Sequence, residues 1–193
     1  ELCTTNQSLL KAVITRPDAR KGRGKKTLPS PVKKEALIHN IPIFEIDNKH
    51  DFAIKIDELK PDLVLVAAYG VILSKDIVDR YLCINVHASL LPKYRGASPI
   101  HAALLNNEKT TGITLFKISE KMDTGDIYYT FPIEINDKDN LKSLHDKLAD
   151  LSVNSVKVLL ENLIANTCPT PIQQNHEEAT YCKKLSKEDT IIY

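Results

Sequence analysis

The sequence predicts an α/β fold in which helices flank a mainly parallel sheet in a Rossmann-like arrangement. Residues 63–68 (LVLVAA) form a continuous apolar run rich in valine and leucine, which is typical of a strand buried on both faces of a parallel sheet. Predicted strands at 41–46 and 82–86 alternate with predicted helices, and such alternation indicates βαβ units. We therefore expect one α/β domain.

Local signals define the other elements in order. Residues 9–15 read as the end of a helix that runs into a strand, and the glycine- and proline-rich residues 16–30 read as a loop. Ser30 followed by Pro31 is a typical helix start, and Ser74 and Ser98 mark two more. Helices are expected at 31–40, 49–59, 75–81, 99–105 and 141–165, and further strands at 111–118 and 127–135.

Length and composition indicate a soluble globular protein. The chain has 193 residues, 42% of them hydrophobic, and no apolar run approaches the length of a membrane span. No signal peptide is visible at the start, and the four cysteines lack the spacing of a disulfide set or a zinc site. We therefore expect a cytoplasmic protein without a metal.

Positive charge is concentrated near the start of the chain. The formal net charge is only +1, yet residues 16–34 contain eight Lys or Arg and one acid, Asp18. A lysine- and arginine-rich run is usually a solvated face, but clustered charge on a loop can also attract a polyanion. Charge alone leaves both interpretations open.

The segment 83–96 (CINVHASLLPKYRG) carries the strongest chemical signal. Asn85 and His87 are two residues apart at the end of a predicted strand, so their side chains project from the same side. Such strand ends are where open α/β sheets place their ligands. Asp123, in a turn after the strand at 111–118, adds a carboxylate. Amide, imidazole and carboxylate together suit acyl transfer, although each alone is more often a turn, surface or core residue.

These residues resemble the signature of the folate-dependent formyltransferases. Asn85-Val-His87, the run Ser89-Leu-Leu-Pro92 and the later Asp123-Thr-Gly125 stand in that family's order and close to its spacing. The basic run at 16–33 looks like the insertion loop of the branch that acts on methionyl-tRNA, and residues 180–188 look like the segment that leaves its catalytic domain. The resemblance covers nearly the whole chain.

The resemblance implies a Rossmann-like formyltransferase domain that moves a formyl group from 10-formyltetrahydrofolate to the amine of initiator methionyl-tRNA. Asn85 and a protonated His87 would donate to the formyl oxygen, on which negative charge grows in the tetrahedral intermediate. His87, or a water held by Asp123, would carry the proton, and Asp123 would orient His87.

Two groups of binding residues carry over from the family. The segment after the apolar strand and the Ser-Leu-Leu-Pro run would form a slot for the folate, although the apolar members also suit a plain core. These residues are Ala68, Tyr69, Gly70, Val71, Ile72, Leu73, Ser89, Leu90, Leu91 and Pro92. Arg95 is a further candidate for a phosphate or folate contact. The tRNA would meet the basic loop at Arg20, Lys21, Arg23, Lys25 and Lys26.

The resemblance also predicts how the chain is divided. We expect a catalytic domain over 1–166, with its basic loop at 16–30, and an extended linker over 167–193 toward a C-terminal β-barrel domain that this chain does not contain. We also expect the family's first strand to be missing from this chain. The resemblance further implies a bacterial cytosol or an organelle of bacterial descent as its location. We expect a monomer. Two rival functions remain: a formyltransferase for a small amine, such as an amino sugar or glycinamide ribonucleotide, and a tRNA-binding fragment without turnover.

Overall fold

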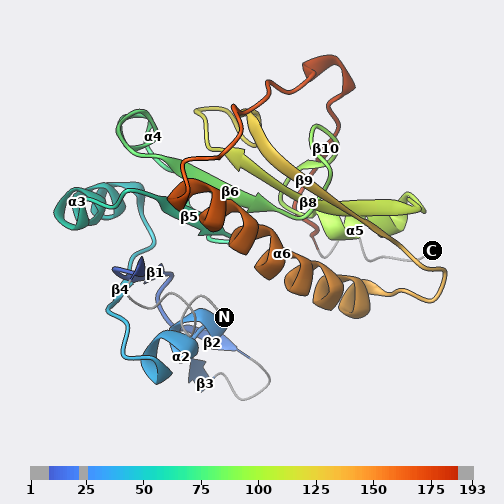
Figure 1. Cartoon of the computed structure of the whole chain (residues 1–193). Coiled ribbons are helices and arrows are strands. Elements are labelled where there is room, and N and C mark those ends of the chain that lie inside the picture. Colours follow the sequence, from blue (N-terminus) through green and yellow to red (C-terminus); the bar gives the residue numbers. More distant parts are fainter. Residues whose placement is uncertain (1–8, 22–25, 187–193) are drawn as a thin grey trace. The chain divides into compact units, whose positions relative to one another are not determined.

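The computed structural model describes residues 9–21 and 26–186 (Figure 1). The chain divides into two compact units. The first contains Glu1–Val64 and Tyr69–Leu82, and the second contains Leu65–Ala68 and Cys83–Tyr193.

The first unit packs three helices with a short parallel strand pair. β1 (Val13–Thr15) pairs in parallel with β4 (Ile43–Glu45), as the sequence predicts for strands on either side of a helix. The helices are α2 (Pro31–Ile38), α3 (Lys49–Leu59) and α4 (Lys75–Arg80). Their buried apolar residues include Ala36, Phe52, Ile56 and Ile77.

The predicted helix starts hold at each position, but only some of them are capped as expected. The Ser30 hydroxyl accepts from the backbone N–H of Lys33 at 3.1 Å and so satisfies one of the free donors at the start of α2. Asn48 does the same for α3, accepting from Asp51 N at 2.9 Å. Ser74 stands at the N-cap of α4, yet its side chain makes no capping hydrogen bond. The prediction was right for the position and wrong for that contact.

The basic segment is not simply a loop. β2 (Ala19–Lys21) and β3 (Lys26–Leu28) form an antiparallel pair with Ala19 opposite Leu28, while residues 22–25 lie outside the described residues. Strands this short and this basic show no alternation of apolar and polar residues, so no strand signal was visible at these positions.

The second unit is built on a four-stranded sheet in the order β5–β6–β8–β9. The strands are β5 (Val64–Ala67), β6 (Cys83–His87), β8 (Thr110–Lys117) and β9 (Ile127–Glu134). β6 pairs with β8, and β8 with β9, in antiparallel fashion. The α/β class is therefore confirmed, but the sheet is mixed rather than mainly parallel. The link from Lys117 to Ile127 is too short for a parallel crossover, which explains the antiparallel return.

β5 is less covered than its apolar sequence predicts. Val64 is buried, Leu65 and Val66 are half-buried, and Ala67 is exposed. β5 stands at the edge of the four-stranded sheet, and an edge strand has a neighbour on one side only. Because Val64 alone is buried, burial on both faces was a wrong expectation for most of this run.

α6 (Leu141–Ile164) packs along β8 and β9 and contacts α5 (Pro99–Leu105) (Figure 1). Its helical stripe is confirmed, because Leu144, Leu148 and Leu159 are buried. No helix in the described part of the chain is both long and apolar enough to cross a membrane.

The segment after α6 is extended, as predicted, but it lies against the second unit. Ile172 bridges to Ile127 in β9, and β10 (Tyr181–Cys182) pairs in parallel with β7 (Arg95–Gly96). Between them, η2 (His176–Glu178) makes one 3₁₀ turn. The linker toward a further domain stays a prediction, but residues 172–182 are bound to the loops that follow β6 and β8.

Candidate active site

β6 carries the predicted catalytic pair to the end of a strand. Cys83 and Ile84 are fully buried and anchor the strand, while Asn85 faces Phe116 and His87 faces Thr114 across the pairing with β8. The side chains of Asn85 and His87 lie on the same side of the sheet because they are two residues apart on a strand.

His87 is held in a defined orientation. Its side chain is almost fully buried, its Nε2 lies 2.9 Å from Tyr94 O, and its ring meets Phe116 edge-on. A carbonyl oxygen only accepts, so Nε2 must carry a proton. Nδ1 then faces the Oδ2 of Asp123 at 3.8 Å. The contact with Tyr94 therefore fixes which ring nitrogen is left for chemistry.

Asp123 meets His87 through an unusual backbone conformation. Its φ of 53° is left-handed, and its Oδ2 accepts from Gly96 N at 2.7 Å. Two residues later, a Cβ on Gly125 would lie 1.7 Å from Lys117 O, so only glycine fits there. The Asp-Thr-Gly segment is thus a tight turn that also brings a carboxylate to the imidazole. Asp123 is therefore both a turn residue and a neighbour of His87, the two interpretations that the sequence offered.

Asn85 completes the predicted set. It is half-buried, and within the described residues its side-chain amide makes no hydrogen bond. The NH₂ group is therefore available to a ligand, whereas Nε2 of His87 is occupied by Tyr94 O. A free amide donor beside an imidazole suits an oxygen that gains negative charge.

The Ser89–Pro92 run is fastened to β8. The Ser89 hydroxyl donates to Lys93 O at 2.6 Å, and Ser89 O accepts from the Thr114 hydroxyl at 2.6 Å. Leu91 N donates to the same hydroxyl at 3.1 Å, and the Leu91–Pro92 peptide is cis. Ser89 and Leu91 are buried supports, so Leu90 and Pro92, which are half-buried, are the better candidates for ligand contact.

The other predicted folate residues fall on both units. Ala68 belongs to the second, and Tyr69–Leu73 belong to the first. Ala68 and Gly70 adopt positive φ, and Ile72 is 71% exposed. Leu73 is buried. The Tyr69 hydroxyl donates to Ile46 O at 2.7 Å, and burial raises its pKa. The folate slot stays a prediction.

Arg95 does not point to a ligand. It is 1% exposed, and its Nε and Nη2 donate to the Oε1 of Gln174 at 3.1 and 2.7 Å. Its Nη1 donates to the Tyr181 hydroxyl at 3.1 Å. The expected phosphate or folate contact is therefore wrong. Sequence reasoning missed Gln174 entirely, because it lies in a polar, proline-rich stretch without a recognisable pattern.

Neither Cys83 nor Cys182 has the setting of a nucleophile. Cys83 is buried on β6, and burial raises the pKa of its thiol to about 11. Burial also raises the pKa of Cys182. A thiolate is the reactive form, so both groups are poor nucleophiles at neutral pH. Cys83 is therefore a packing residue of the buried strand.

The predicted tRNA residues lie on or between the strands of the β2–β3 hairpin. Arg20, Lys21 and Lys26 are part of its backbone ladder, with side chains outside the described set, and Arg23 and Lys25 lie outside the described residues. The hairpin base is anchored by Lys33, whose Nζ lies 2.8 Å from a carboxylate oxygen of Asp18 and 2.8 Å from one of Glu45. These contacts raise the pKa of Lys33.

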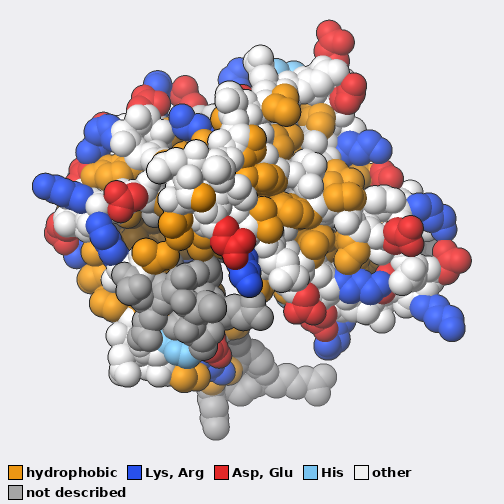
Figure 2. Space-filling view, viewed as in Figure 1, with side chains coloured by type: hydrophobic (Ala, Val, Ile, Leu, Met, Phe, Trp, Pro, Cys, Tyr) orange, Lys and Arg blue, Asp and Glu red, His pale blue; other side chains and the backbone are white. Residues whose placement is uncertain are grey.

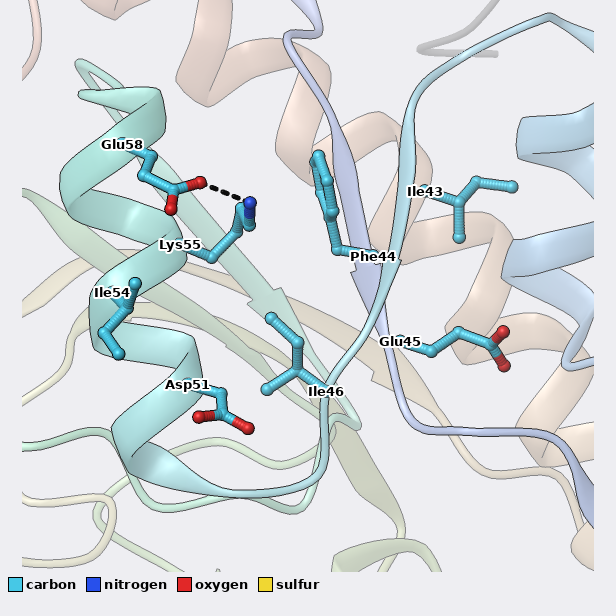
Figure 3. Close-up of a pocket in the computed structure, with 8 residues that line it drawn as sticks. All are labelled: Ile43, Phe44, Glu45, Ile46, Asp51, Ile54, Lys55 and Glu58. Carbon is cyan, nitrogen blue, oxygen red and sulfur yellow. Dashed lines mark hydrogen bonds and ion pairs between the residues drawn. The ribbon is translucent and has the colours of Figure 1, made fainter.

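A separate hollow of about 390 Å³ lies between β4 and α3 in the first unit (Figure 3). Lys55 stands 4.3 Å above the Phe44 ring and also pairs with Glu58. None of the predicted site residues lines this hollow. Among the described residues, no group of three or more His, Cys, Asp or Glu is placed to hold a metal ion.

The second unit therefore joins a mixed α/β sheet to a strand-end amide, a buried imidazole and a facing carboxylate, an arrangement that suits a group-transfer enzyme. A family model described as formyl transferase matches residues 2–160. The chain belongs to this family.

Its relatives agree with this assignment. The chain is 46% identical over 185 residues to a methionyl-tRNA formyltransferase of Kosmotoga olearia, covering 93% of this chain and 59% of the relative. It is 41% identical over 184 residues to that of Bacillus subtilis, covering 93% and 58%. The chain thus spans less than two thirds of the length of these relatives.

A solved structure supports the fold. The crystal structure of HypX from Aquifex aeolicus in complex with tetrahydrofolic acid matches with a TM-score of 0.68 at 20% identity, covering 82% of this chain and 28% of that one. At this identity the likeness concerns the fold alone.

Proposed function

We propose that this chain is the catalytic part of an enzyme that transfers the formyl group of 10-formyltetrahydrofolate to the amine of initiator methionyl-tRNA, for translation initiation. The observation that carries the chemistry is the 3.8 Å approach of Asp123 to His87 Nδ1, beside the free amide of Asn85. The choice of acceptor rests on the 41–46% identical relatives named methionyl-tRNA formyltransferase.

The acceptor amine attacks the formyl carbon to form a tetrahedral intermediate. The Asn85 amide donates to the oxygen, which becomes negatively charged. Loss of one such donor typically costs about 100- to 1,000-fold in rate.

Collapse of the intermediate breaks the bond between the formyl carbon and N10 of the folate. The amine must lose a proton and N10 must gain one. Since Nε2 of His87 is committed to Tyr94 O, Nδ1 is the nitrogen that takes the amine proton and returns it. The Asp123 carboxylate stabilises the imidazolium that forms between the two steps. Such contacts are often long in the free enzyme and shorten with substrate.

The folate is expected to meet the exposed Ala68 and the half-buried Leu90 and Pro92 of the second unit. A pterin is flat with polar edges, so it suits apolar walls with backbone donors and acceptors at the rim. The HypX structure from Aquifex aeolicus is a complex with tetrahydrofolic acid, which supports a folate as the donor here.

The acceptor RNA is expected to follow the β2–β3 hairpin. On the face shown in Figure 2, acidic and basic side chains are interspersed and no single-sign patch dominates. Concentrated positive charge is instead a property of residues 16–34, where it would neutralise phosphates and release counterions.

The direct test is label transfer. The full-length protein is incubated with 10-formyltetrahydrofolate labelled in the formyl group and with initiator methionyl-tRNA, uncharged tRNA, an amino sugar nucleotide or glycinamide ribonucleotide. Label on the methionyl-tRNA alone is expected. Label on a small amine would replace the proposed acceptor, and tRNA binding without any transfer would favour the fragment without turnover.

A further inference from the structure

We propose that Gln174 is a positioning residue for the Asp123 turn, and that buried Arg95 fixes the direction of its amide. This inference rests on the proposed function of Asp123. Gln174 is 4% exposed and comes from the segment after α6, far in sequence from the turn that it holds.

The orientation of the Gln174 amide is dictated by its neighbours. Its Nε2 lies 3.0 Å from Asp123 O and 2.7 Å from Gly125 O, and both of these oxygens only accept. Its Oε1 lies 2.7 Å from the Nη2 of Arg95, and a guanidinium only donates. A flipped amide would oppose donor to donor and acceptor to acceptor, so only one orientation satisfies all contacts.

The two hydrogen bonds from Nε2 of Gln174 hold the turn at its two most constrained residues. Asp123 has the left-handed φ that a non-glycine residue adopts at a cost, and Gly125 passes against Lys117 O. Clamping both carbonyls stabilises this conformation, which in turn sets the position of the Asp123 carboxylate against His87 Nδ1.

Arg95 is more than a packing residue. Its described partners are neutral: the Gln174 amide, the Tyr181 hydroxyl and Nδ1 of His176 at 2.9 Å. Because Arg95 cannot accept, the His176 Nδ1 must accept, and its proton lies on Nε2. A buried charge held by neutral acceptors stabilises mainly through geometry, which suits a residue whose role is to orient an amide.

Residues 174–182, which we name the strap, also secure the partners of the site. The Thr180 hydroxyl accepts from Tyr94 N at 2.9 Å, and Cys182 O accepts from Ala97 N at 3.1 Å. A Cβ on Gly96 would lie 2.3 Å from Cys182 O, so the two chain segments touch backbone to backbone. The residues whose backbone atoms bind His87 and Asp123, Tyr94 and Gly96, are thus both held by the strap.

The test compares Gln174→Glu with Gln173→Glu in the full-length protein. Gln173 is the exposed neighbour, so it provides the same chemical change outside the network. Glu at 174 keeps an acceptor for Arg95 but turns an oxygen toward two carbonyl oxygens. We expect kcat to fall by about 10- to 100-fold, with the KM values for folate and methionyl-tRNA within about twofold of the control.

Selective ¹⁵N labelling of histidine supplies a readout that a merely structural role would not move. In Gln174→Glu the shift of His87 Nδ1 is expected to change, whereas that of Nε2, which faces Tyr94 O, should stay. Gln174→Met, which keeps the length and removes both polar groups, should give the same change if Gln174→Glu does not fold.

The outcomes separate the two proposals. Unchanged kcat and an unchanged Nδ1 shift in folded Gln174 variants would overturn the positioning role. If the unaltered protein fails to formylate methionyl-tRNA, the proposed function fails, while the Nδ1 shift still decides whether Gln174 positions Asp123.

Discussion

Each unit contains a cation that ties separate segments together, and the two are built in opposite ways. Lys33 in the first unit binds two carboxylates, and its side chain is 17% exposed. Arg95 in the second unit is 1% exposed and binds neutral groups. Ion pairs near water hold a segment with little net stabilisation, whereas a buried guanidinium with a partner at each of its nitrogens fixes geometry.

This difference indicates that the two units serve different parts of the proposed function, binding and catalysis. The first unit presents charge on a hairpin that is anchored at its base, and such charge gives affinity without exact placement. The second unit holds an imidazole and a carboxylate through backbone contacts, and chemistry needs such placement. Changes in the second unit should therefore alter turnover, and changes to the hairpin should alter binding.

The largest expected effect is on turnover. In the full-length protein, His87→Ala should lower formyl transfer by at least about 100-fold while folate binding stays near normal, because the proton carrier is lost and the binding surface is kept. Single-turnover kinetics and equilibrium folate binding measure the two. His145→Ala, on the exposed side of α6, is the control. Near-normal turnover in His87→Ala would contradict the proposal that the second unit carries the catalytic residues.

The next effect concerns tRNA binding. Alanine substitutions throughout the hairpin should weaken tRNA binding, while the rate of formyl transfer to bound methionyl-tRNA should stay near normal. The replaced residues are Arg20, Lys21, Arg23, Lys25 and Lys26. The slope of log K against log salt should fall by about one for each side chain that meets a phosphate. Titrations at several salt concentrations measure it, with Lys138→Ala/Lys157→Ala as an exposed control. Equal slopes in both variants would make the hairpin a solvated face.

A third experiment compares the two cations in stability. Arg95→Met should lower the free energy of unfolding by about 1–3 kcal/mol, because the buried Oε1 of Gln174 loses its donors. Lys33→Met, with partly exposed partners, should shift the urea midpoint less. The pKa of Lys33 is raised in the folded state, so its contribution should persist through neutral pH and disappear only at strongly alkaline pH. A larger loss for Lys33→Met would reverse the comparison.

The smallest effect concerns Cys83. Burial raises the pKa of its thiol from an ordinary value of 9.0 to about 11, so the unfolded chain releases this proton first. Stability should therefore fall as pH rises from about 9 to about 11, and part of that fall should disappear in Cys83→Ala. Denaturant titrations at pH 8 and 10 measure it. Rapid alkylation of Cys83 in the folded protein at pH 8 would show that the strand opens.

Much of the site could be predicted because it is local. The spacing of Asn85 and His87 on one strand specifies a shared side of the sheet, and the Asp-Thr-Gly segment predicts a tight turn. Ser30 acts as the predicted cap through a contact three residues away. Each of these signals is contained within a few residues of sequence.

The rest depends on contacts between distant residues. Gln174 reaches Asp123 and Gly125 across some fifty positions, and no periodicity marks it. Arg95 was misassigned because a basic residue after the strand of the predicted catalytic pair suits a ligand as well as a buried partner. The mixed sheet was missed because strand patterns do not say which strands pair, and β8 pairs in antiparallel fashion with both β6 and β9.

The residue at the position of Gly125 predicts whether a homologous chain can form the same turn. Any side chain at the corresponding position would collide with the carbonyl at the end of the preceding strand, so the turn would have to open. The acidic residue two places earlier would then no longer reach the imidazole. Homologous chains that carry a larger residue there are expected to have abandoned this chemistry, even where the asparagine and histidine of the neighbouring strand remain.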